Sequence, residues 1–146
     1  MKSTLLQESE GRRKFMIVLA TGDEAVQCVT SFARDQRLRA SHFTAIGAFS
    51  NAVVGYFDWQ TKDYRKIPIA GQVEVLSLIG DVTAGEDGPK VHAHAVLGRE
   101  DATAHGGHLL EGHVRPTLEI VLTEAPVHLR RRYDPESGLA LIDPMG

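Results

Sequence analysis

The alternation of polar and apolar positions along this chain favours strands over helices. Short apolar runs rich in β-forming residues predict strands at 14–20, 64–69, 72–83, 90–97, 107–114 and 117–124, and a last strand at 127–133. Between residues 42 and 58 the apolar pattern is broken by Gly47 and by the Ser50–Asn51 pair. We therefore predict two strands there, one ending near Phe49 and one covering Ala52–Asp58.

One segment has the period of an amphipathic helix. Between Asp23 and Arg39, apolar residues recur every three or four positions, whereas the residues between them are polar or charged. Thr21 or Asp23 is the expected N-cap, since both residue types accept hydrogen bonds from the first turn. The pattern predicts a single main helix over about residues 23–39.

A single early helix within a series of strands predicts the α+β class, built on a mostly antiparallel sheet. The 146 residues suffice for one domain but not for two. We expect this domain to span residues 14–133, followed by a C-terminal segment at 134–146. Residues 1–13 are polar and of mixed charge, so we expect an N-terminal tail or an edge segment.

Composition and charge exclude several classes of protein. The net charge of −3 argues against general binding of polyanions, which requires a basic face. The single cysteine, Cys28, cannot form an internal disulfide and fits a reducing compartment. The sequence has neither an apolar run of ~18 residues nor the apolar core of a signal peptide. We expect a cytoplasmic protein that does not span a membrane.

Histidines provide the clearest sign of chemistry, because five of the seven lie between positions 92 and 113. On a strand, His92 and His94 share one face, with Cα atoms ~7 Å apart. Two imidazoles at that spacing can bind one ion. Our candidate for a third ligand is His108, because Gly106 and Gly107 before it permit unusual dihedral angles and a close approach of the backbone.

Three protein ligands leave one position open for water or a small molecule, as in catalytic and ligand-binding metal sites. Imidazole ligands favour Zn²⁺ over Mg²⁺ or Ca²⁺, although nickel, iron and copper also accept them. His105 falls in the loop before the expected strand, with undetermined orientation, and we keep it as an outer-shell candidate. His113 is five residues beyond His108 and faces the opposite side of a regular strand. The plain alternative is a set of hydrogen-bonded or solvated structural histidines.

A His-x-His pair on a strand also belongs to the metal motif of the cupin barrel. That motif requires a glutamate three to four residues after the second histidine. The nearest here is Glu100, and five residues separate it from His94. The expected helix at 23–39 also fits a cupin poorly, so we disfavour this alternative.

Six segments appear in the order found in one known family: 47–52 (GAFSNA), 55–58 (GYFD), 73–80 (VEVLSLIG), 92–94 (HAH), 106–109 (GGHL) and 117–120 (TLEI). Together they closely resemble the plants-and-prokaryotes-conserved (PPC) domain, over about residues 14–125. The resemblance implies an α+β fold with one main helix, assembled as a homotrimer. It also implies that His92, His94 and His108 match the histidines associated with metal in prokaryotic members.

The resemblance also assigns Glu119 to the family's glutamate position after the glycine-histidine strand. There it is a candidate outer-shell partner that orients an imidazole, or a plain solvated strand residue. In plants the domain is joined to AT-hook segments that bind DNA, but this chain lacks the Arg-Gly-Arg-Pro core. Its basic clusters, Gly11–Lys14 and Arg130–Arg132, are short. The second is either a phosphate contact or an exposed, solvated edge.

Three hypotheses follow. The first is a trimeric ligand-binding or regulatory module that holds zinc, or another divalent transition metal, on three histidines. The second is a metal-dependent enzyme that uses the open position; a carboxylate beside the metal would favour it. The third is a DNA-binding protein by family analogy, which a continuous basic face would favour. We find no nucleophile–base pair and no paired carboxylates in the sequence.

Overall fold

The computed structural model describes residues 1–85 and 87–144. Nine strands and one helix follow one another as β1 (Lys2–Ser9), β2 (Arg12–Ala20), α1 (Ala25–Asp35), β3 (Ala40–Asp58), β4 (Asp63–Ile69), β5 (Val73–Gly85), β6 (Gly88–Gly98), β7 (Ala104–Glu124), β8 (Arg130–Asp134) and β9 (Leu139–Asp143). All strand pairs are antiparallel except β5 with β8. The predicted α+β class with one main helix is confirmed.

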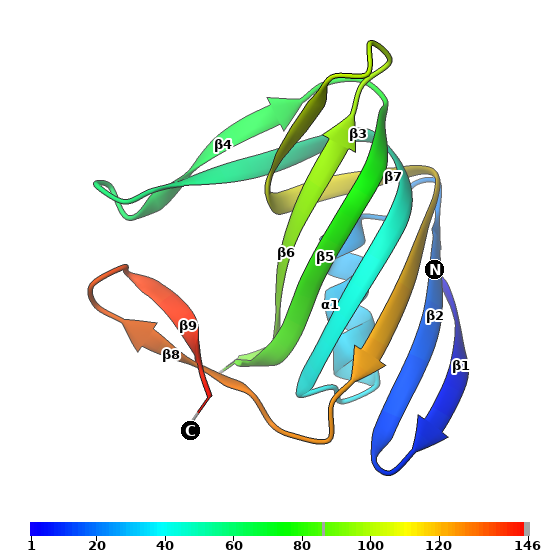
Figure 1. Cartoon of the computed structure of the whole chain (residues 1–146), viewed down its shortest axis with the longest axis vertical. Helices are drawn as coiled ribbons and strands as arrows, with labels where there is room; N and C mark the ends of the chain where they lie inside the picture. The colour runs from blue at the N-terminus through cyan, green and yellow to red at the C-terminus, as the bar shows by residue number, and fades with distance from the viewer. Residues whose placement is uncertain (86, 145–146) are drawn as a thin grey trace.

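The sheet runs in the order β1-β2-β7-β3-β5-β8-β9, with β4 paired to β3, and β6 paired to both β5 and β7. As a result β3, β5, β6 and β7 form a closed circuit of pairings. The helix lies behind this bent sheet, and the β3–β4 and β8–β9 hairpins project on the same side of the molecule (Figure 1).

The two long strands β3 and β7 correct the sequence analysis, which divided each of them in two. Their register shifts near Gly47, where the sheet bends without ending. Gly47 has φ of +151°, and a Cβ there would lie 2.2 Å from the carbonyl oxygen of Thr117. A glycine that breaks the apolar pattern is therefore a site of close backbone approach within a strand rather than its end.

The helix is shorter than the predicted range of 23–39. Its N-cap is Glu24, rather than Thr21 or Asp23, and the Glu24 carboxylate accepts hydrogen bonds from the backbone of Val26 and Gln27. The same carboxylate accepts from the amide of Gly112 at 2.9 Å, which ties the start of the helix to β7.

The core lies between the helix and the concave face of the sheet. Val29, Phe32 and Ala33 of α1 are buried there, and Phe32 meets Phe15 of β2 edge to face at 5.1 Å. The largest side chains with no significant exposure come from β2, β3, β5, β6 and β7: Phe43, Phe49, Ile17, Leu19, Leu78, Leu97, Leu118, Ile120 and Leu122. Burial of this apolar surface is the main source of stability.

Both ends of the chain differ in detail from the sequence analysis. Residues 2–9, for which we expected a tail or an edge segment, form the exposed edge strand β1, paired with β2. The last predicted strand begins at Arg130 rather than at 127, and β9 was not predicted. Among the described residues, no helix has the length and apolar content needed to cross a membrane.

Candidate metal centre

His92, His94 and His108 come together on the outer face of β6 and β7, and we call them the histidine cluster. His92 and His94 alternate with the buried residues Ala93 and Ala95. Because Ala93 and Ala95 pack into the core, both imidazoles face outward. His108 lies directly opposite His94 in the β6–β7 register. That cross-strand pairing places all three rings on one side of the sheet.

The three rings are close enough to bind one ion. One ligand-type nitrogen from each histidine lies within 4.8 Å of the other two. Ring centroids are 5.1 Å apart for His92 and His94, 5.1 Å for His92 and His108, and 5.6 Å for His94 and His108. Nitrogens around a tetrahedral zinc ion with bonds of ~2.0–2.1 Å lie about 3.4 Å apart, so small side-chain rotations close the geometry.

His108 is the most enclosed of the three. Its Nδ1 is buried and has no hydrogen-bond partner among the described residues. Tyr64 of β4 stacks on its ring at a centroid distance of 4.6 Å. A buried nitrogen without a partner costs roughly 1–3 kcal/mol, and a bound cation would remove that penalty. The donor set and this orphaned nitrogen therefore fit a transition metal.

The protonation state of the cluster also suits a cation. Burial, reinforced by the neighbouring His92 and His94, lowers the pKa of His108 from 6.5 to about 4. Burial and His92 also lower the pKa of His94. Both rings are thus neutral at pH 7, and a neutral imidazole is the form that ligates metal.

The two glycines before His108 act by close approach alone. A Cβ on Gly106 would lie 2.9 Å from the carbonyl oxygen of Ala95, and one on Gly107 would lie 2.8 Å from that of Gly55. Neither glycine has a positive φ, so the unusual dihedral angles we expected are absent at both. Their role is to let β7 pack tightly between β6 and β3.

Asp81 is the residue beside the cluster that the sequence analysis missed. Its Oδ2 lies 3.6 Å from Nδ1 of His92, and its Oδ1 accepts a hydrogen bond from Arg131 at 2.7 Å. Burial alone would raise the pKa of Asp81, but His92 and Arg131 together hold it below its ordinary value. The only available signal was that Asp81 shares the outward face of its strand with Ile79.

The remaining candidates lie apart from the cluster. His105 is within β7, not in a preceding loop, and alternation directs its exposed side chain to the face opposite His108. His113 lies 3.8 Å from Glu111. Glu119 is exposed and sits between Val18 and Ile46 in the register. Its role as a partner of an imidazole stays a prediction, which a neighbouring copy of the chain would have to satisfy.

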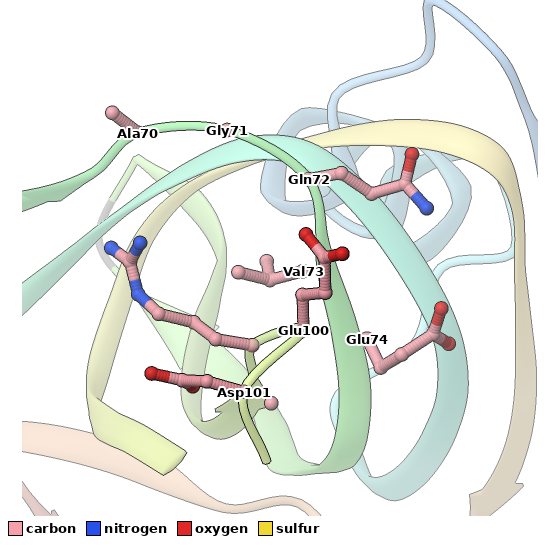
Figure 2. Close-up of a pocket in the computed structure, with 9 residues that line it drawn as sticks. Ala70, Gly71, Gln72, Val73, Glu74, Glu100 and Asp101 are labelled. Carbon is pink, nitrogen blue, oxygen red and sulfur yellow. The ribbon is translucent and has the colours of Figure 1, made fainter. Parts of the chain in front are cut away.

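A hollow of about 950 Å³ lies at the other end of β6. It is lined by residues 70–74 and 98–101. Figure 2 shows that the carboxylates of Glu74, Glu100 and Asp101 point in different directions rather than toward one point. This hollow therefore lacks the convergent ligands that the histidine cluster has.

Known proteins that are about 30% identical in sequence share this fold. The Plants and Prokaryotes Conserved (PCC) domain matches residues 6–126. A plant- and prokaryote-conserved (PPC) protein from Pyrococcus horikoshii is 31% identical, with a TM-score of 0.85 over 99% of this chain and 96% of that one. A metal-containing protein from Archaeoglobus fulgidus is 32% identical, with a TM-score of 0.83 over 97% of this chain and 99% of that one.

A third solved structure, from Ralstonia eutropha, is named as a candidate DNA-binding protein. It is 30% identical, with a TM-score of 0.83 over 88% of this chain and 90% of that one. Comparison with curated proteins gave no match. The matched domain covers most of the chain, and its range includes the six motifs and the single helix. The chain therefore belongs to the Plants and Prokaryotes Conserved (PPC, or PCC) domain family.

Proposed function

We propose that this PPC protein binds a divalent transition metal, with zinc preferred, through His92, His94 and His108. The observation that carries the proposal is that one imidazole nitrogen from each of the three histidines lies within 4.8 Å of the other two, beside a His108 ring whose buried Nδ1 has no hydrogen-bond partner among the described residues. A metal-containing relative that is 32% identical supports it. Three protein ligands leave a position for a small molecule, so the metal would serve a ligand-binding or regulatory module.

The metal proposal is tested by replacing both His92 and His94 with alanine. Elemental analysis of protein purified without added zinc should find metal in the wild type and none in the double variant. The matched control is His113→Ala, which removes a histidine of β7 that lies outside the cluster. This variant should keep the metal content of the wild type. Full metal content in the double variant would show that the site is misassigned.

We further propose that the protein is a cytoplasmic homotrimer. Four exposed apolar side chains of the outer face support an interface: Ile46, Leu76, Ile79 and Val96, which are 61%, 55%, 55% and 43% exposed. We call them the apolar stretch, and three of them line a shallow hollow of about 350 Å³. Contiguous exposed apolar residues mark interaction surfaces. Light scattering should report about three times the chain mass of 16.0 kDa, and a clean monomer would refute the trimer.

An enzyme is the second candidate, because Asp81 puts a carboxylate beside a metal site with an open position. Such an enzyme would use the bound metal to activate water or polarise a carbonyl. However, Oδ1 of Asp81 is bonded to Arg131 and Oδ2 faces His92. A carboxylate engaged on both oxygens is better suited to orient a ligand than to accept a proton. The binding module therefore stays our first proposal.

DNA binding is the third candidate, favoured by the name of the Ralstonia relative. Three of the six basic side chains in the two basic clusters form ion pairs within the chain. Arg13 pairs with Glu124, Arg131 with Asp81, and Arg132 with Asp143. Arg131 was expected to be exposed, but its side chain is only 12% exposed. A gel-shift assay in 150 mM salt should show no complex, and a sequence-selective complex would favour this candidate over ours.

A further inference from the structure

The β8–β9 hairpin is held to the body of the protein by few backbone contacts. It lies outside the segment matched by the family, which ends at residue 126. Its pairing with β5 consists of one residue pair, Ala84 with Arg130, and one hydrogen bond joins Ala84 N to the carbonyl of Leu129 at 3.0 Å. Side chains must therefore supply most of the attachment.

Arg131 supplies that attachment. Its Nε donates to Oγ1 of Thr83 at 2.9 Å, its Nη2 donates to Asp81 at 2.7 Å, and its Nη1 donates to the carbonyl of Ala140 at 3.0 Å. Thr83 is fully buried, and the Arg131 side chain is 12% exposed. A planar guanidinium with three fixed partners holds a carboxylate in a defined orientation.

Asp81 passes this orientation to His92. With Oδ1 held by Arg131, Oδ2 faces Nδ1 of His92 at 3.6 Å, a distance that a small ring rotation shortens to a hydrogen bond. A carboxylate at Nδ1 favours the tautomer with the proton on that nitrogen. Nε2 of His92 is then the atom left with a free lone pair for a ligand.

The hairpin also reaches the opposite wall of the cluster. Nζ of Lys62, in the turn between β3 and β4, donates to the carbonyl of Pro135 in the β8–β9 turn at 3.0 Å. β4 carries Tyr64, whose ring stacks on His108. The C-terminal hairpin thus contacts β5, whose Asp81 faces His92, and also the β3–β4 hairpin, whose Tyr64 stacks on His108.

We propose that Arg131 is a positioning residue of the metal site, which acts through Asp81 to fix His92 with Nδ1 protonated and Nε2 free for the ion. The C-terminal hairpin, although outside the matched family segment, therefore sets the metal affinity. This inference rests on the proposed metal-binding function.

The first test compares zinc affinities of full-length Arg131→Gln, Asp81→Asn and wild-type protein, by competition with a chromophoric chelator. Loss of a partner that orients a ligating histidine weakens binding about 10–100-fold, and we expect both variants in that range. The matched control is Arg132→Gln, on the same hairpin, whose side chain is 78% exposed and contacts Asp143. Its affinity should stay within about twofold of the wild type.

The second test needs no metal. Long-range ¹H–¹⁵N spectra of the metal-free protein should show His92 as the Nδ1–H tautomer in the wild type and in Arg132→Gln. Asp81→Asn and Arg131→Gln should shift it toward Nε2–H, the form favoured in water. If Arg131→Gln does not fold, as judged by circular dichroism, Asp81→Asn and Thr83→Val still report on the same chain of contacts.

The outcomes separate the two proposals. Wild-type protein that binds no zinc refutes the proposed function, whatever the tautomer of His92. Wild-type protein that binds zinc, with Arg131→Gln and Asp81→Asn equal to Arg132→Gln in affinity and tautomer, refutes the positioning role and leaves the metal site standing.

Discussion

The outer face of the sheet has two adjacent regions of opposite character: the histidine cluster on β6 and β7, and the apolar stretch on β3, β5 and β6. At one end, the histidine cluster is surrounded by groups that orient it: Asp81 beside His92, and Tyr64 stacked on His108. Next to it, the apolar stretch exposes aliphatic side chains without polar partners, and Ile79 pairs directly with His94 across the strands.

Because of this difference, the two regions are suited to bind different partners. The histidine cluster presents imidazole nitrogens from three residues that are held in place by neighbouring groups, an arrangement suited to a small charged ligand such as a metal ion. Exposed aliphatic groups gain free energy when any complementary surface covers them. Each region should therefore respond to its own kind of mutation, and the predictions below test that independence.

The largest expected effect is on assembly. Ile46→Glu combined with Leu76→Glu would place two charges within the apolar stretch, and burying unpaired charges is strongly unfavourable. We expect the mass measured by light scattering to fall from three chains to one. Val127→Glu changes an apolar residue that is 54% exposed but outside the stretch, and it should stay trimeric. A trimeric double variant would place the interface elsewhere.

Metal should stabilise the protein only through the histidine cluster. A ligand that binds the folded state at 100 times its Kd adds about 2.7 kcal/mol to the free energy of unfolding. We expect zinc to raise the melting temperature of the wild type and to leave that of His92→Ala/His94→Ala unchanged. Calorimetry with zinc and with a chelator measures both. An equal shift in the double variant would mean that zinc acts at another place.

Acid should destabilise the metal-free protein through His108. Folding holds the pKa of His108 at about 4, below its ordinary 6.5, so between these values the unfolded chain takes up a proton that the folded chain does not. Stability of the metal-free protein should therefore fall as the pH drops from 6.5 to 4. Urea unfolding of His108→Gln should show a smaller loss over this window. Equal losses in both proteins would contradict the buried, neutral state of His108.

The smallest effect is expected from His105, which lies on the other side of β7. His105→Ala should change the zinc affinity by less than about twofold, because its exposed side chain faces away from His108. The chelator competition used for Arg131→Gln measures it. A tenfold loss of zinc affinity would instead support the sequence-based hypothesis that His105 is an outer-shell residue of the site.

Much of the fold followed from local patterns. The alternation of residues 90–97 predicted β6 and the shared face of His92 and His94, because successive strand side chains point to opposite sides. The helix was found from its apolar period, although its cap, Glu24, was not, since glutamate is not among the preferred N-cap residues. The division of β3 was wrong because a glycine can mark a bend as well as an end, and that of β7 was wrong because the strand continues through Arg115 and Pro116.

The chain by itself thus determined the alternating strands, the single helix, the outward pair His92–His94 and the order of motifs that belongs to the family. Only the tertiary structure decided that His108 stands opposite His94 and that Asp81 and Arg131, 50 residues apart, meet beside His92. The physical reason is the difference between local interactions and interactions among residues far apart in the sequence. Side-chain direction along one strand is set by neighbouring dihedral angles, whereas the register between strands and the docking of a hairpin depend on packing summed over the whole sheet.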